Sequence, residues 1–310
     1  MDDHLPLRLD LYLVRYGIAS SRRQARDLIA RGLVQVNGRC LRKAAPVQPG
    51  DRVEAAPSAP PTITPNPALS LEVLYQGAAL LVINKPALMP CHPLDSRECQ
   101  TVMNGVVARF PETALGALKP LEGLLVHRLD NGTSGALMVA RSRASLELAR
   151  NALHRGEIDR RYLALVEGSL DGSIELDAAV GHHRHSRARM VALKASRGAG
   201  GRPAVTRIVA LRQLGDYTLV EARPTTGNRH QIRVHLAAAG WPIAGDVQYG
   251  ARAVPTLAAG RFFLHLHQLA FPAAISEGPN ASGGSRRYIV APLPSDLVFT
   301  SALASGNPLA

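Results

Sequence analysis

Short apolar runs recur along most of the chain, and Gly, Pro or small polar residues separate them. Runs of this length predict buried strands, whereas apolar residues spaced three and four apart predict helices with one buried face. The expected strands are 80–83, 136–140, 161–166, 204–211 and 217–222, and the expected helices are 143–155 and 229–239. Several strands follow one another with no helix between them. The predicted fold is therefore α+β, with a mixed, mostly antiparallel sheet rather than a doubly wound parallel one.

Before position 57 the pattern predicts two helices followed by a small hairpin. The second helix would begin near residue 21, where a serine at position 20 or 21 can cap it. Arg22 and Arg26 stand four apart and would share one face of this helix, with Arg23 nearby. Asn37-Gly38 lies between short alternating segments and predicts a tight hairpin turn. An ordinary amphipathic helix pair with a solvated basic face is the alternative interpretation.

Proline marks the boundary between this module and the rest of the chain. Prolines stand at positions 57, 60, 61, 65 and 67. Such a density predicts an extended, semi-rigid linker. We therefore expect an N-terminal domain at 1–56, a linker at 57–71, a large domain at 72–300 and a disordered tail at 301–310.

The charge balance favours a nucleic-acid partner. The formal net charge is +12, and arginine supplies most of it because lysine occurs only at positions 43, 85, 119 and 194. Guanidinium groups bind phosphate in a bidentate manner and stack on bases. A GC-rich genome, which enriches Arg, Ala and Gly together, is the alternative explanation of this bias.

Several other classes of protein are disfavoured. The three cysteines are scattered at positions 40, 91 and 99 and form no C-x-x-C pair, which argues against a disulfide framework and a structural zinc site. No apolar run approaches the ~20 residues of a membrane span. The first ten residues carry three acids and no apolar core typical of a signal peptide. We expect a cytoplasmic protein without membrane association and, by default, a monomer.

The segment from His127 to Met138 is the most informative in the chain. It places Asp130 in a turn rich in Asn, Gly, Thr and Ser, directly before an apolar run. A carboxylate on a tight loop beside a buried strand is a candidate nucleophile or base. The chain offers no metal cluster, phosphate-binding loop or cofactor motif as a substitute. An aspartate that only caps the turn is the alternative.

The N-terminal module resembles a known RNA-binding domain. The resemblance covers about residues 7–55 and rests on Ser-Arg-Arg at 21–23, Leu28-Ile29, Gly32, Val34, Val36-Asn37-Gly38 and Gly50-Asp51. These residues resemble the S-four-type (αL) domain that a ribosomal protein, tyrosyl-tRNA synthetases and several RNA-modifying enzymes share. The resemblance implies that Arg22, Arg23 and Arg26 dock on the phosphates of structured RNA. Such contacts position an RNA without reading its sequence.

Four segments of the large domain carry a second resemblance. They are Asn84-Lys85-Pro86 followed by His92-Pro93, the Asp130 segment, the strand 161–168, and Thr226 to His235 with Gly245-Asp246 and Tyr249-Gly250 downstream. In this order they resemble the bacterial large-subunit rRNA (RluA-like) pseudouridine synthases that carry an S-four-type domain. The resemblance extends over about residues 7–296 and implies the pseudouridine synthase fold. That family modifies uridines in ribosomal RNA, and other members act on tRNA.

The resemblance places Asp130 where the family has its essential aspartate. The family reaction detaches uracil from ribose, turns it and reattaches it through carbon, so the resemblance implies that no cofactor is needed. The aspartate would attack the sugar or remove a proton from it, and both roles stay open. Arg233 would pair with Asp130 and fix its orientation. An arginine on the surface of an amphipathic helix is the alternative reading of Arg233.

The same resemblance assigns contacts with the substrate. Tyr162 would give the extruded uracil a stacking surface, worth about 1–3 kcal/mol, or it is a half-buried strand tyrosine. Leu264 would line the pocket, although a single leucine is also typical of a plain core. Arg128 is hypothesised to fill the stack that the extruded base leaves. Arg229, one turn before Arg233 on the expected helix, would add a phosphate contact.

Four positions depart from the family pattern. Asn228 replaces the usual arginine, which leaves in doubt whether Arg229 takes over its contact. Asn131-Gly132 replaces the commoner Lys-Asp, and Leu88 stands where glycine is usual. These departures bear on the choice of substrate more than on the reaction.

Two other patterns suggest different chemistry. His182, His183 and His185 fit no tetrahedral spacing, and neighbouring arginines would repel a cation, so a basic RNA-contacting loop that includes Lys194, Arg197 and Arg202 is expected instead of a metal site. Ser134 is not in a G-x-S-x-G motif and has no evident base, which argues against a serine hydrolase.

The favoured function is therefore an RNA pseudouridine synthase acting on structured RNA, with large-subunit rRNA as the expected partner and tRNA as an alternative. A non-catalytic RNA-binding ribosome-assembly factor is a second hypothesis, and a metal-dependent nuclease is a third. The sequence does not identify the uridine that is modified.

Overall fold

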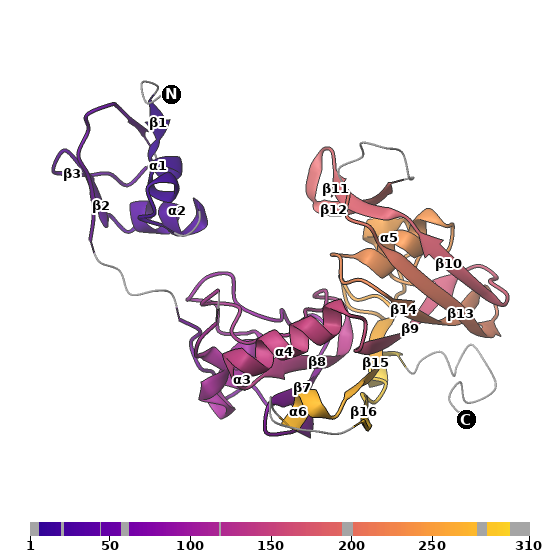
Figure 1. Cartoon of the computed structure of the whole chain (residues 1–310). Coiled ribbons are helices and arrows are strands. Elements are labelled where there is room, and N and C mark those ends of the chain that lie inside the picture. Colours follow the sequence, from indigo (N-terminus) through magenta and orange to yellow (C-terminus); the bar gives the residue numbers. More distant parts are fainter. Residues whose placement is uncertain are drawn as a thin grey trace. The chain divides into compact units, whose positions relative to one another are not determined.

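The computed structural model describes residues 6–19, 22–43, 45–56, 62–117, 119–193, 201–277 and 284–297. It divides into two compact units, Met1–Pro60 and Pro61–Ala310 (Figure 1). The predicted serine cap at 20–21, the basic residues Lys194 and Arg197, and the tail at 301–310 lie outside the described residues. No described helix is long and apolar enough to cross a membrane.

The first unit has the two helices and the hairpin that its pattern predicts. Its elements are β1 (Leu7–Arg8), α1 (Leu9–Arg15), α2 (Arg22–Ala30), β2 (Val34–Val36), β3 (Arg39–Cys40), β4 (Pro46–Val47) and β5 (Val53–Ala55). Strand β2 lies between β3 and β5, and β1 pairs with β4. Asn37 and Gly38 both have positive φ angles, 52° and 76°, as a two-residue turn of type I′ requires. The core of this unit consists of Leu9, Leu13, Ala19, Ala25, Leu28, Ile29, Val34 and Val47.

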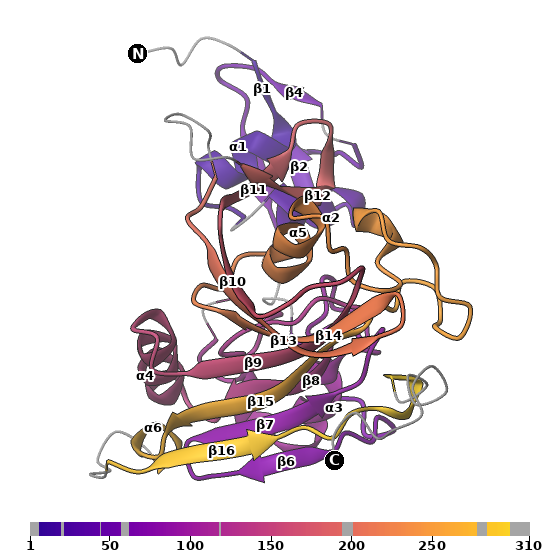
Figure 2. The same cartoon turned by 90° about the vertical axis from the view of Figure 1, so that its right-hand side faces the viewer.

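The second unit is built on a mixed nine-stranded sheet, which confirms the predicted α+β class (Figure 2). The strand order is β10-β13-β14-β9-β15-β8-β7-β6, and β16 pairs with the second half of β15. Every pair is antiparallel except β15 with β8. The strands are β6 (Val73–Gln76), β7 (Leu80–Lys85), β8 (Ser134–Ala140), β9 (Asp159–Glu167), β10 (Ser173–Asp177), β13 (Val205–Leu214), β14 (Tyr217–Pro224), β15 (Leu264–Pro272) and β16 (Arg286–Val290).

Helices and one separate hairpin cover this sheet. Helix α4 packs against β8, and α5 packs against β13 and β14. The hairpin contacts α5. These elements are α3 (Val102–Arg109), α4 (Arg143–His154), α5 (Gln231–Ala238), α6 (Ala274–Glu277), the 3-10 turns η1 (Pro111–Ala114) and η2 (Val247–Tyr249), and the hairpin strands β11 (Ala179–His183) and β12 (Ser186–Leu193).

Two local features follow directly from residue chemistry. The Ser142 hydroxyl accepts a hydrogen bond from the backbone N–H of Ser145 and caps α4, as predicted. Gly135 has φ 115° where β8 meets β15, and a Cβ atom there would lie 2.3 Å from the carbonyl oxygen of Leu266. Only glycine permits this close parallel pairing at the start of β8.

Two expectations differ from the structure. The helix predicted from residue 229 begins at Gln231, because His230 adopts a left-handed conformation with φ 55° and acts as the N-cap. Residues 62–71, expected to be part of an extended linker, pack on the second unit. Ile63 is buried in its core, and the N–H of Asn66 donates to the carbonyl oxygen of Asn104 at 2.9 Å. Proline favours extended backbone but does not prevent packing of the apolar residues between prolines.

Candidate active site

Asp130 lies in the loop before β8, and a buried lysine holds this loop. The Nζ of Lys85 donates to the carbonyl oxygens of Thr133 (2.7 Å), Asn131 (3.2 Å) and Pro86 (2.8 Å). Lys85 is 0% exposed, and burial lowers its pKa to about 8. The ammonium therefore replaces its hydration shell with three backbone carbonyls and ties the residues just after Asp130 to the end of β7.

The expected ion pair between Asp130 and Arg233 is present. The Nη1 of Arg233, from α5, donates to the Oδ2 of Asp130 at 3.2 Å. The side chain of Asp130 is 22% exposed, whereas that of Arg233 is 5% exposed. One carboxylate oxygen is thus tied to a buried cation while the group still reaches the solvent.

A second carboxylate, to which the sequence analysis assigns no role, holds the same guanidinium. The Nε and Nη2 of Arg233 donate to the two oxygens of Asp246 at 2.7 and 2.8 Å, and Nη2 also donates to Gln248 at 2.8 Å. The guanidinium carbon lies 4.8 Å from the ring centre of Tyr249 and 4.2 Å from that of Phe262. Burial alone would lower the pKa of Arg233, but the two aspartates outweigh it and raise this pKa above its usual value.

Tyr162 and Leu264 lie on neighbouring strands of the central sheet. Tyr162, on β9, pairs with Leu266 of β15, and Leu264 at the start of β15 pairs with Ala164. Both side chains are largely buried, with exposed fractions of 7% and 3%. Burial raises the pKa of Tyr162 to about 12, and the charge of Asp130 contributes to this shift. The phenol is therefore neutral at physiological pH and presents a ring rather than an anion.

Arg261 is a second buried cation that supports the Asp130 loop, and no sequence pattern pointed to it. It is 2% exposed and donates to the carbonyl oxygen of Gly132 (2.6 Å) and to the Oγ of Ser134 (3.0 Å). Its Nε lies 2.7 Å from a carboxylate oxygen of Asp296. A Cβ atom on Gly132 would lie 2.3 Å from the carbonyl oxygen of Gly260. This close approach explains why glycine stands at position 132.

Ser134 was expected to have no base beside it, and this expectation is wrong. The Oγ of Ser134 lies 2.9 Å from the Nδ1 of His265, and the Nε2 of that ring lies 3.2 Å from the carbonyl oxygen of Ala291. Both side chains are buried, with 2% and 0% exposure. Since a substrate carbonyl has no access to them, the pair stabilises the β8–β15 junction rather than forming a hydrolytic site.

Arg128 lies at a more exposed position beside Asp130. Its side chain is 60% exposed, and its Nη1 lies 3.6 Å from Glu122 and donates to the Nε2 of His92 at 3.3 Å. Cys91 is buried next to it, and its sulfur contacts both the N–H and the carbonyl oxygen of Leu129 at 3.3 Å. The backbone before Asp130 is therefore anchored while the Arg128 side chain reaches outward.

The later start of α5 changes the position expected for Arg229. Arg229 precedes the helix, so it does not share a helical face with Arg233, and its Nη2 donates to the carbonyl oxygen of Ala188 at 3.3 Å. Asn228 donates through Nδ2 to the carbonyl oxygen of Pro203 at 3.0 Å. The residue that departs from the family pattern thus ties this turn to the chain before β13.

In the first unit, arginines surround one buried carboxylate. Asp10 is 0% exposed and accepts hydrogen bonds from Arg8 (2.9 Å), Arg22 (3.1 Å) and Arg26 (3.3 Å). Burial alone would raise the pKa of Asp10, but these hydrogen bonds outweigh it and lower the pKa to about 2. Arg23 lies on the same helix with an exposed side chain.

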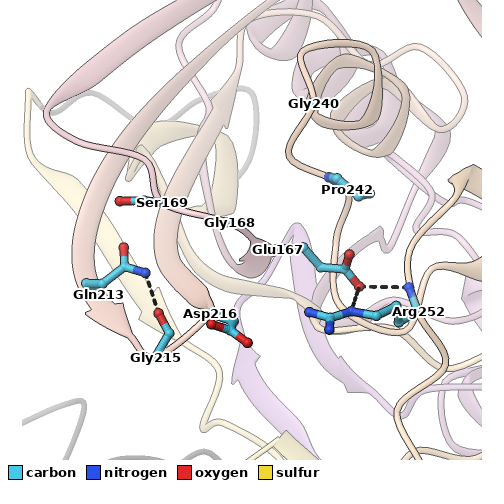
Figure 3. Close-up of a pocket in the computed structure, with 9 residues that line it drawn as sticks. All are labelled: Glu167, Gly168, Ser169, Gln213, Gly215, Asp216, Gly240, Pro242 and Arg252. Carbon is cyan, nitrogen blue, oxygen red and sulfur yellow. Dashed lines mark hydrogen bonds and ion pairs between the residues drawn. The ribbon is translucent and has the colours of Figure 1, made fainter.

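Two further features lie apart from Asp130. His182 and His183 belong to β11, and the rings of His183 and His185 are 6.0 Å apart. Within the described ranges, no three His, Cys, Asp or Glu residues are placed to hold a metal ion. An open cavity of about 550 Å³ lies beyond the end of β9 and is lined by Glu167, Gly168, Ser169, Gln213, Gly215, Asp216, Gly240, Pro242 and Arg252 (Figure 3). None of the candidate site residues lines it.

The site thus combines a partly exposed carboxylate, Asp130, with the clamped guanidinium of Arg233 and the strand tyrosine Tyr162. Residues 79–238 match the family model described as RNA pseudouridylate synthase, and residues 7–53 match the S4 domain. The chain belongs to the RNA pseudouridine synthase family, and it is an isomerase that acts on RNA.

Individual relatives agree with this membership. An RNA pseudouridine synthase of Chloroflexus aurantiacus is 36% identical over 94% of this chain and 87% of its own length. The ribosomal large subunit pseudouridine synthase D of Neisseria meningitidis serogroup B is 29% identical over 94% of this chain and 76% of its own. The structure of human RNA Pseudouridylate Synthase Domain Containing 1 has a TM-score of 0.57 at 26% identity and covers 78% of this chain and 90% of the human one.

Proposed function

We propose that Asp130 is the catalytic carboxylate of this synthase and that its substrate is a uridine of large-subunit ribosomal RNA. The observation that carries the proposal is the position of Asp130. Its carboxylate is 22% exposed, and one oxygen is bound to the buried Arg233 at 3.2 Å. Arg233 would thus fix the orientation of a carboxylate, a group that can attack carbon or accept a proton.

The surrounding residues suit the isomerisation of uridine. In this reaction the N1–C1′ bond breaks, the C5–C1′ bond forms, the hydrogen on C5 leaves as a proton and N1 gains a proton. Atoms and electrons therefore balance without an oxidant or a cofactor. Asp130 would attack C1′ or remove a proton from the ribose, while Tyr162 and Leu264 would contact the uracil. Arg128, with its exposed guanidinium, would occupy the stack that the extruded uridine leaves.

The proposed target follows from the first unit and from one relative. The arginines around Asp10 form a face with more positive than negative charge, which suits the phosphates of structured RNA. The Neisseria meningitidis relative is described as a ribosomal large subunit enzyme. We propose action in the cytoplasm, where ribosomal RNA is found. We also propose that the protein acts as a monomer.

Release of tritium from 5-tritiated uridine tests the role of Asp130. Wild type should release tritium from 23S rRNA transcripts, and Asp130→Asn should release none while it keeps the fold and RNA affinity of wild type. Equal release by both proteins would refute the catalytic role. Release by neither would favour a non-catalytic assembly factor.

Mapping of pseudouridine in a deletion strain tests the target. A site that is lost from large-subunit rRNA and restored by the wild-type gene, but not by the Asp130→Asn gene, would support the proposal. Loss confined to tRNA would instead assign the enzyme to tRNA.

A further inference from the structure

We propose that His230 is a second positioning residue for Asp130. The imidazole of His230 would hold the carboxylate oxygen that does not bind Arg233, and Tyr249 would orient this imidazole. The inference rests on the proposed catalytic role of Asp130. Asp130 and His230 belong to two loops of the second unit, and neither residue lines the cavity beyond β9.

The two oxygens of Asp130 face different partners. Oδ2 accepts from Arg233 at 3.2 Å, whereas Oδ1 lies 3.9 Å from the Nε2 of His230. The longer distance exceeds that of a hydrogen bond, yet a small rotation of either side chain would close it. Hydrogen bonds at active sites are often long without substrate and tighten when the substrate binds.

The opposite side of the imidazole has a defined partner. The Nδ1 of His230 lies 2.7 Å from the hydroxyl of Tyr249, and that hydroxyl accepts the backbone N–H of Met190 at 3.0 Å. Because the hydroxyl oxygen accepts the hydrogen bond from Met190, the hydroxyl can donate its own proton to Nδ1 of His230. This arrangement places the ring proton on Nε2, so that an N–H group faces Asp130.

Burial determines the kind of interaction that His230 offers. The side chain is 10% exposed, and burial lowers its pKa to about 4 despite the nearby charge of Asp130. The ring is therefore neutral near pH 7, and it presents a fixed N–H dipole rather than a second positive charge. Because each carboxylate oxygen can accept more than one hydrogen bond, Oδ1 would keep a lone pair for the ribose.

The backbone supports a specific role for this position. His230 has φ 55°, a left-handed conformation that is uncommon for residues other than glycine, although asparagine, aspartate and histidine adopt it more often than the rest. This conformation ends the preceding turn and directs the imidazole toward both Tyr249 and Asp130 instead of along α5. Strained residues of this kind cluster at sites where geometry matters for function.

Three substitutions at position 230 separate positioning from simple packing. His230→Ala removes the ring. His230→Asn tolerates the left-handed backbone and retains an amide near Tyr249, but it is too short to reach Asp130. His230→Gln places an amide N–H near the position of Nε2. Steady-state kcat and KM would be measured on an rRNA transcript, together with thermal unfolding and RNA affinity.

We expect Ala and Asn to lower kcat by about 10- to 100-fold with KM and RNA affinity unchanged, because a carboxylate that is misplaced by a fraction of an ångström loses productive geometry. Gln should restore kcat to within a few fold of wild type. Tyr249→Phe, which keeps the ring against Arg233 and loses only the hydroxyl, should lower kcat less, and it should add nothing in the His230→Ala background.

Two results would overturn the inference. One is a kcat for His230→Asn within twofold of wild type, and the other is a Gln variant as impaired as the Asn variant when both fold and bind RNA. Asp130→Asn, measured in the same series, keeps this outcome separate from the proposed function. If Asp130→Asn retains full activity, the catalytic assignment itself fails, whatever the His230 variants do.

Discussion

The two units contain opposite arrangements of carboxylate and guanidinium. In the first unit, three arginines surround one fully buried carboxylate, Asp10. In the second unit, two carboxylates, Asp130 and Asp246, share one buried arginine, Arg233. The first cluster therefore has excess positive charge on exposed side chains, and the second has an excess carboxylate that is partly exposed. Under the proposed function, Asp10 would organise cations for phosphate, whereas Arg233 would orient an anion for the reaction.

The comparison suggests how one kind of ion pair, between aspartate and arginine, would serve RNA binding in one unit and the reaction in the other. A buried carboxylate cannot reach a substrate, so Asp10 acts only through its arginines. The buried guanidinium of Arg233 has a bidentate contact with Asp246 and only one hydrogen bond to Asp130, so the second oxygen of Asp130 would be available for the substrate. In this comparison, the number of carboxylates per arginine and the identity of the buried group would decide whether a cluster binds phosphate or takes part in the reaction.

The largest expected effect is on activity. Asp130→Asn removes the excess carboxylate from the second cluster and should lower kcat by about 10³-fold or more, because an amide is neither a base nor a nucleophile. Melting temperature should stay close to that of wild type, since Arg233 keeps its bidentate contact with Asp246. An unchanged turnover rate in tritium release would mean that the excess carboxylate has no catalytic role.

The next effect concerns the arginine clamp. Asp246→Ala leaves a buried guanidinium without its bidentate partner and should lower the free energy of unfolding by about 3 kcal/mol. Gln248→Ala is the matched control, because Gln248 bonds to the same guanidinium but is uncharged and exposed. We expect it to change stability by less than about 0.5 kcal/mol in urea titrations. Equal effects of the two substitutions would show that Asp246 does not hold Arg233.

Asp10→Asn tests the first cluster. A model based on net charge alone predicts tighter RNA binding, because the substitution adds one positive charge. The arrangement around Asp10 predicts weaker binding, by about tenfold, because Arg8, Arg22 and Arg26 lose the acceptor that orders them. Filter binding of the full chain to an rRNA fragment at fixed salt distinguishes these results, and tighter binding would contradict the ordering role.

The same carboxylate predicts a pH dependence. The folded pKa of Asp10 is lowered from 3.8 to about 2, so its contribution to stability is fully present above pH 3.8. This contribution is lost as the pH falls from 3.8 toward 2. Acid titration of the full chain, followed by resonances of the first unit, should show its unfolding shifted to higher pH in Asp10→Asn. Superimposable acid transitions would contradict this linkage.

The smallest effect concerns the backbone beside Asp130. Leu88 has φ 61°, and its N–H donates to the carbonyl oxygen of Asn131 at 2.7 Å. Leu88→Gly should raise the free energy of unfolding by less than about 1 kcal/mol, because glycine removes the strain but adds entropy to the unfolded chain. Leu88→Ala retains the strain and should bring no gain in thermal unfolding. A gain with alanine equal to that with glycine would exclude backbone strain as the cause.

Local patterns in the sequence predicted strands β7, β8, β9, β13 and β14 and helices α4 and α5 of the second unit. These elements, the Ser142 cap and the Asn37-Gly38 turn depend on residues that are adjacent or a few positions apart, so their signals are local. Strands β6, β10 to β12, β15 and β16 and helices α3 and α6 were not predicted. Alternating exposed and partly buried residues, as in β10, give a weak pattern when a strand lies at the edge of a sheet.

The sequence by itself determined the segments, the family resemblance and the pairing of Asp130 with Arg233 that the resemblance implied. Only the tertiary structure decided that Asp246 also binds this arginine and that Lys85 and Arg261 hold the Asp130 loop. It alone also decided that Asp10 accepts hydrogen bonds from the N-terminal arginines. It also decided that position 230 is left-handed, which moved Arg229 away from the face of Arg233. The physical reason is separation along the chain: Asp130 and Arg233 are 103 positions apart, and Gly132 and Arg261 are 129 positions apart. Hydrogen bonds over such distances depend on strand order and burial, which no local pattern of residues encodes.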